Sequence, residues 1–156
     1  MIELHASSVC IDGAALLLRG PSGAGKSDLA LRLIDGGALL VADDRVCVTR
    51  EGQGLVASAP PALAGLIEVR GLGILPVPSI ASAPLQLVVD LIAGGAGERL
   101  PPPRHITLCG STLPVLALDP WHASAAAFLR LALRALRTGA PLVPGEAAWS
   151  AAVEPV

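Results

Sequence analysis

The sequence predicts an α/β fold, in which a mixed β-sheet with few helices carries a phosphate-binding loop. The first observation is a complete G-x-x-x-x-G-K-[ST] motif, the Walker A pattern, at Gly20–Ser27. The second is its context. The apolar segment Ala14–Leu18 leads directly into the motif, and the helical pattern Lys26–Ile34 follows it. The third is the apolar segment Leu39–Ala42, which ends in two adjacent aspartates.

Short apolar segments separated by turn residues predict the strands. The Asp12-Gly13 and Glu51–Gly54 segments predict tight turns between neighbouring strands. The glycines of Glu68–Gly73 predict a turn before another strand. The predicted strands are Ile2–His5, Val9–Ile11, Ala14–Leu18, Leu39–Ala42, Arg45–Thr49, Leu55–Ser58, Ile74–Val77, Leu85–Ile92, His105–Leu108 and Leu113–Leu118.

Helices are predicted at three places. The first, Lys26–Ile34, has an apolar face and ends at Gly36-Gly37. A short helix begins at Pro60-Pro61 and continues to Leu66. The last, Ser124–Thr138, has Ser124 as its N-cap and Gly139 as its end. Three prolines follow, so we expect residues 1–139 to form one domain and residues 140–156 a loosely packed C-terminal tail.

Composition excludes several classes of function. No apolar segment reaches the ~18 residues that a membrane span requires. No basic segment precedes an apolar stretch at the start of the sequence, so we expect no secretory signal. The net charge of −2 argues against nucleic-acid binding. Three widely spaced cysteines without a C-x-x-C pair predict reduced thiols, and therefore a cytoplasmic protein.

The motif predicts a nucleotide phosphate site formed by eight consecutive residues. Its glycines let backbone N–H groups turn toward phosphate oxygens, and the helix that follows adds its positive N-terminal dipole. Lys26, the one lysine among eleven basic residues, should bridge the β- and γ-phosphates of ATP. Ser27 should place its hydroxyl on Mg²⁺. The residues of the loop are Gly20, Pro21, Ser22, Gly23, Ala24, Gly25, Lys26 and Ser27.

The adjacent carboxylates of Asp43 and Asp44 predict a division of labour. One would hold the metal ion or its waters, and the other would exchange a proton with the hydroxyl that is phosphorylated. A solvated turn paired with Arg45 is the alternative interpretation. The chain contains no asparagine. It therefore has neither the N-K-x-D guanine reader of a GTPase nor the catalytic-loop asparagine of a eukaryotic-type protein kinase.

From Ile2 to Pro76 the sequence resembles the catalytic domain of HPr kinase/phosphorylase, in the short alphaproteobacterial-type form that lacks a separate N-terminal domain. Four segments carry the resemblance, in order and at matching spacing. They are His5, the loop Gly20–Ser27, the segment Val41-Ala42-Asp43-Asp44-Arg45-Val46, and the segment Glu68-Val69-Arg70-Gly71-Leu72-Gly73-Ile74.

The resemblance implies a phosphoenolpyruvate carboxykinase-like P-loop fold and a regulator of the phosphotransferase system. It implies an ATP-dependent kinase of a serine on the phosphocarrier protein HPr, which can also remove that phosphate with inorganic phosphate. By resemblance, Asp44 exchanges the serine proton, Lys26 neutralises the phosphates, and Ser27 and Glu68 hold Mg²⁺. His5 lies near the transferred phosphate. A homo-oligomer, the hexamer of the family, is also implied.

Two further segments bear on the resemblance. Arg99, in the segment Glu98–Leu100, aligns with an active-site arginine of the family. The family's Gly-Arg-Asn segment, which is tied to dephosphorylation, is absent from Pro114–Pro120, so the phosphorylase activity stays open. The stripe of Arg130, Arg134 and Arg137 is either a partner surface or a solvated helix face whose C-terminal cations favour the helix dipole.

Two other functions stay open. The chain could be a nucleotide-sensing P-loop module with little turnover that regulates a signalling partner. It could also be a P-loop kinase of a small metabolite. Transfer of phosphate to HPr would separate the first interpretation from both.

Overall fold

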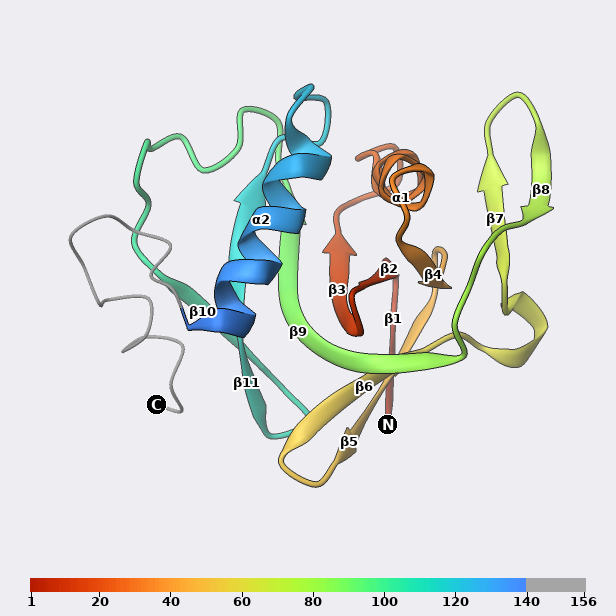
Figure 1. Cartoon of the computed structure of the whole chain (residues 1–156), viewed down its shortest axis with the longest axis horizontal. Helices are drawn as coiled ribbons and strands as arrows, with labels where there is room; N and C mark the ends of the chain where they lie inside the picture. The colour runs from red at the N-terminus through yellow and green to blue at the C-terminus, as the bar shows by residue number, and fades with distance from the viewer. Residues whose placement is uncertain (140–156) are drawn as a thin grey trace.

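The computed structural model describes residues 1–139, and within them it contains a nine-stranded mixed sheet, a separate two-stranded sheet and two α-helices (Figure 1). The strands of the large sheet are β1 (Ile2–Leu4), β2 (Ala6–Ile11), β3 (Ala14–Arg19), β4 (Leu39–Ala42), β5 (Val46–Glu51), β6 (Gly54–Ser58), β9 (Ser82–Leu91), β10 (Arg104–Leu108) and β11 (Ser111–Leu118). The helices are α1 (Lys26–Asp35) and α2 (Ala125–Thr138). The small sheet pairs β7 (Leu66–Val69) with β8 (Gly73–Pro76).

The sheet is mixed, as the sequence predicts. β9 runs parallel to both β3 and β11, whereas β2 pairs antiparallel with β3 and β4. In Figure 1, β9 is the long curved strand, with α1 and α2 above its curve and the β5–β6 hairpin below it. Because β2 lies between β3 and β4, the loop that follows β3 and the acidic pair that follows β4 reach the same edge of the sheet.

The core lies on both faces of the central strands. On one face, Leu16 and Leu18 of β3 pack with Leu29 of α1 and Leu129 of α2. On the other face, Leu17 packs with the strands of the β5–β6 and β10–β11 hairpins. A strand that is buried on both faces reads as a continuous apolar run, which is why Ala14–Leu18 has no polar alternation.

Arg130 of α2 is fixed against the end of α1. Its guanidinium donates a 3.1 Å hydrogen bond to the carbonyl oxygen of Leu33, in the last turn of α1. A cation at this position stabilises the negative end of the helix dipole. Arg134 and Arg137 are exposed. The predicted arginine stripe therefore divides into one arginine that joins two helices and two that face solvent.

The structure corrects three local predictions. The helix predicted from Pro60 to Leu66 is only a single 3₁₀ turn, η1 (Pro61–Leu63), after which β7 begins at Leu66. Ile67 of β7 is fully buried, and this packing favours a strand over a helix at these residues. Glu68 and Val69 belong to that strand, which shortens the predicted turn Glu68–Gly73.

The third correction concerns the start of α2. Ser124 precedes the helix as predicted, but its side chain makes no capping hydrogen bond. Its φ and ψ of −88° and 3° differ from the extended geometry that an N-cap side chain requires. Gly139 ends α2 in the left-handed conformation, as predicted.

The predicted tail, residues 140–156, lies outside the described residues. No helix within residues 1–139 is long and apolar enough to cross a membrane.

Candidate active site

The phosphate-binding loop connects β3 to α1, and its lysine is already oriented by backbone carbonyls. Gly23 and Gly25 have φ angles of 84° and 99°, which favour glycine. Lys26 is 7% exposed, and its ammonium donates to the carbonyl oxygens of Gly20 at 2.7 Å and Pro21 at 3.0 Å. An ammonium has three donors, so one N–H stays free for an anion held by the loop.

Asp43 is the buried member of the acidic pair. Its Oδ1 accepts hydrogen bonds from the hydroxyls of Ser7 at 3.0 Å and Ser27 at 2.7 Å. Its Oδ2 accepts the backbone N–H of Glu68 at 3.2 Å. One carboxylate therefore joins β2, the start of α1 and β7. It holds the Ser27 hydroxyl and the Glu68 backbone in place.

Asp44 points away from the buried contacts of Asp43 and is exposed to solvent. Its φ of 68° is a left-handed conformation, which reverses the chain directly after Asp43. Its backbone N–H donates to the Ser7 hydroxyl at 3.2 Å, which fixes this reversal. The exposed Asp44 carboxylate then lies 2.6 Å from Nε2 of His5. Adjacent carboxylates thus have different environments, as the predicted division of labour requires.

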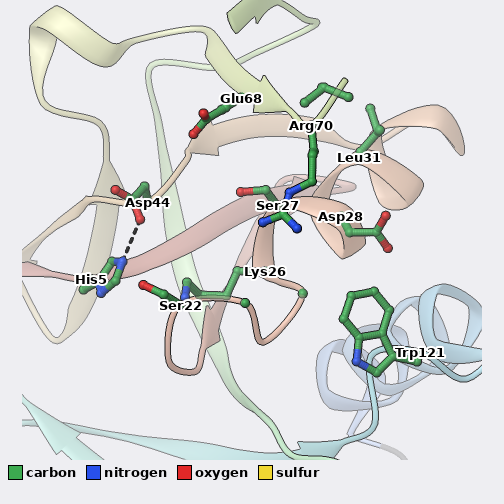
Figure 2. A pocket seen from close by; sticks show the side chains of 13 residues that line it. His5, Ser22, Lys26, Ser27, Asp28, Leu31, Asp44, Glu68, Arg70 and Trp121 are labelled. Carbon is green, nitrogen blue, oxygen red and sulfur yellow. Dashed lines mark hydrogen bonds and ion pairs between the residues drawn. The ribbon is translucent and has the colours of Figure 1, made fainter. Parts of the chain in front are cut away.

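These groups surround one cavity of about 430 Å³. Five of the six residues predicted for catalysis or metal binding line it: His5, Lys26, Ser27, Asp44 and Glu68. Figure 2 shows His5 and Asp44 on one side of Lys26 and Ser27, with Trp121 and Asp28 on the other. A phosphate chain held by the loop would therefore have an acid–histidine pair at one end.

The side chains next to the loop fit a magnesium ion. Ser27, Asp43 and Glu68 offer hydroxyl and carboxylate oxygens, the ligands that Mg²⁺ prefers. Asp43 contacts the Ser27 hydroxyl directly, which is the usual relation of a Walker A serine and the acid of the next strand. Within residues 1–139, no three histidine, cysteine or acidic side chains form a metal cage. Phosphate oxygens and water would have to complete the coordination, as is common for Mg²⁺.

Arg99 is not part of this cavity. It is exposed in the loop between β9 and β10, and its neighbour Glu98 lines a different cavity beside α2. The arginine that does line the cavity is Arg70. It follows β7, and in Figure 2 its guanidinium lies beside Ser27. Arg99 thus lies apart from the other predicted site residues, and its role in the active site stays a prediction that rests on the resemblance.

Sequence reasoning left two more residues of the site out. Ser7 has no motif of its own, and only the pairing of β2 with β4 brings it to Asp43. Trp121 reaches the cavity from the turn before α2. Its rarity in a chain with 2% aromatic residues was a signal that could have identified it.

Comparison with known proteins identifies the family of the chain. Residues 1–91 match the family model for the HPr serine kinase C-terminal domain. The chain is 47% identical over 89 residues to the HPr kinase/phosphorylase of Clostridium tetani, which covers 57% of this chain and 28% of that protein. It is 44% identical over 123 residues to that of Burkholderia lata, which covers 74% of this chain and 37% of that protein.

A solved structure extends the similarity beyond the motifs. The structure of the HPr(Ser) kinase/phosphatase from Coxiella burnetii superposes with a TM-score of 0.76 and 26% identity, over 88% of this chain and 97% of that one. The curated relatives are longer, since the matched segments span well under half of each. The family match over more than half of the chain, the P-loop and the acidic pair lead to one conclusion: this chain belongs to the HPr serine kinase C-terminal domain family.

Proposed function

We propose that this protein is a Mg²⁺- and ATP-dependent serine kinase of an HPr-type phosphocarrier protein. The observation that carries the proposal is the exposed Asp44–His5 pair, which lies at the open end of the P-loop cavity. A module that only bound nucleotide would need the loop and a metal ligand. It would have no use for an acid held 2.6 Å from a histidine beside the terminal phosphate.

The proposed transfer uses Asp44 as the proton acceptor. The serine oxygen of the partner forms a bond to the γ-phosphorus while the bond from that phosphorus to the β-phosphate oxygen breaks. The serine proton passes to the Asp44 carboxylate, and ADP leaves with its charge balanced by Lys26. His5 holds the Asp44 carboxylate in place through its 2.6 Å contact. Mg²⁺, held through Ser27, Asp43 and Glu68, would neutralise phosphate charge and align the β- and γ-phosphates.

Removal of the phosphate would use the same groups. An oxygen of inorganic phosphate would form a bond to the phosphorus of the phosphoserine while the bond from that phosphorus to the serine oxygen breaks, which yields pyrophosphate, and protonated Asp44 would return its proton to the serine oxygen. An Asp44 carboxylate that is accessible to a partner serine in one direction is accessible in the other. We therefore propose that the same site also carries the phosphorylase activity.

Intact mass of HPr tests the proposal directly. Incubation of the protein with ATP, Mg²⁺ and HPr should add one phosphate to HPr, and Asp44→Asn should abolish this transfer while ATP still binds. Asparagine tolerates the left-handed conformation of Asp44, so the backbone should stay intact. Tight ATP binding without any transfer by the wild-type protein would favour the nucleotide-sensing module. ATP consumption that only a metabolite stimulates would favour a small-molecule kinase.

Two further properties belong to the proposal. Cys10, Cys47 and Cys109 are all free thiols, which supports a cytoplasmic location. A homo-oligomer, expected as a hexamer, is tested by the mass of the protein in solution.

A further inference from the structure

The cavity has a second end, opposite the Asp44–His5 pair, and an aromatic side chain forms it. Trp121 lines the cavity together with Asp28 and Leu31 of α1. Figure 2 shows these three residues on one side of Lys26 and Ser27, with His5 and Asp44 on the other. The terminal phosphate of a bound nucleotide faces Asp44 in the proposed function, and the inference rests on that orientation. The nucleoside must then extend toward Trp121.

We propose that Trp121 is the stacking platform for the nucleobase of the bound nucleoside triphosphate. The indole is 61% exposed, although it is one of only three aromatic side chains in the chain. It lies directly against the P-loop, since a Cβ atom placed on Gly25 would come within 3.1 Å of the ring. An exposed indole that lines the same cavity as the loop offers a flat apolar face on which a base can stack.

The turn that carries Trp121 is fixed before any ligand binds. The backbone N–H of Trp121 donates to Asp119 Oδ1 at 2.9 Å, and the N–H of Gly94 donates to Asp119 Oδ2 at 3.2 Å. The carbonyl oxygen of Pro120 accepts a hydrogen bond from Arg32 of α1. Arg32 also pairs with Asp28 at 3.0 Å. A platform held from two sides loses little freedom when a base stacks on it.

Stacking predicts affinity without strong selectivity. Every base has a π-face, so a stacked indole tolerates purines of either kind. Among the described residues that line this end of the cavity, Asp28 is the one acid, and Arg32 engages it, so it does not present a free base-reading group. We therefore expect ATP and GTP to bind with similar affinity and to depend on Trp121 to a similar degree.

The experiment compares ligands with and without a base. Binding of ATP, GTP and inorganic triphosphate, each with Mg²⁺, is measured by calorimetry for the wild type, Trp121→Ala and Trp121→Phe. Phe128→Ala is the matched control, because Phe128 is a half-exposed aromatic of α2 that lines the other cavity. Trp121→Ala should weaken the binding of ATP and GTP about 10-fold or more and leave the affinity for triphosphate within about 2-fold of the wild-type value. Trp121→Phe should restore most of the affinity, and Phe128→Ala should change none of the three.

Several outcomes overturn the inference. Equal weakening of ATP and triphosphate would mean that Trp121 only supports the loop through Gly25. Unchanged ATP affinity in Trp121→Ala would mean that the base lies elsewhere. HPr phosphorylation by the same preparations separates this inference from the proposed function. A wild-type protein that binds ATP through Trp121 but transfers nothing to HPr would overturn the function alone. Transfer to HPr with an unchanged KM for ATP in Trp121→Ala would overturn the inference alone.

Discussion

Replacing Asp43 by asparagine should destabilise the fold, whereas the same replacement at the adjacent Asp44 should not. The Asp43 carboxylate accepts three hydrogen bonds, from the hydroxyls of Ser7 and Ser27 and from the backbone N–H of Glu68. An asparagine side chain has one acceptor oxygen. If that oxygen keeps the hydrogen bonds from the two hydroxyls, the NH₂ group of the asparagine side chain faces the Glu68 N–H. Two hydrogen-bond donors then face each other without an acceptor.

The magnitude follows from one lost bond in a buried site. Asp43 is 8% exposed and Ser7 is fully buried, so water does not replace the lost acceptor readily. The donor that loses its acceptor is the Glu68 N–H, whose bond to Asp43 is only part-buried, so the cost lies near the lower end of the range for a lost partner, about 1 kcal/mol. Asp43→Asn should lower the free energy of unfolding by about this amount. It should also raise the Mg²⁺ concentration needed for half-maximal HPr phosphorylation about 10-fold or more, because the neutral amide removes a negative charge beside Ser27 and the Glu68 backbone loses its anchor.

Urea unfolding at neutral pH measures the first effect, and Mg²⁺ titration of the kinase assay measures the second. Asp44→Asn is the matched control. Its side chain is 62% exposed with a single partner, so its stability should stay within about 0.5 kcal/mol of the wild type while transfer is lost. The reasoning is refuted if Asp43→Asn unfolds like the wild type, or if both variants lose stability equally.

Three other perturbations test separate parts of the structure. Lys26→Ala should abolish both ATP binding and HPr phosphorylation, and unchanged ATP affinity in calorimetry would contradict the assignment of the loop. Arg130→Ala should lower the free energy of unfolding by about 1–2 kcal/mol, because the Leu33 carbonyl loses a charged donor. Arg134 is exposed, so Arg134→Ala should change the free energy of unfolding by less than about 0.5 kcal/mol. The N–H groups of Trp121 and Gly94 hold the pKa of Asp119 below its usual range. This carboxylate therefore stabilises the fold above about pH 3.9 and loses its effect as the pH falls further. Asp119→Asn should flatten the acid limb of stability against pH, and identical limbs would contradict the assignment.

Local patterns were sufficient for the framework of the site. The P-loop motif, the helical periodicity after it and the apolar strand before the acidic pair are properties of short segments, and each lies where the sequence predicts it. Backbone turns at glycine, helix dipoles and alternation of buried side chains act over a few residues, so neighbouring residues determine them. The same holds for the end of α2 at Gly139.

Contacts between distant segments decided the rest. Which of two adjacent aspartates is buried depends on Ser7, 36 positions from Asp43, and on the left-handed backbone of Asp44. Trp121 reaches Gly25 only because α2 packs on α1, and Arg70 rather than Arg99 enters the cavity because β7 packs against α1. The sequence by itself predicted a nucleotide phosphate site beside two acids and determined the strand, loop and helix that form its framework. The tertiary structure alone decided which acid meets solvent and that Trp121 lies against the loop, because burial is set by the elements that pack across the sheet.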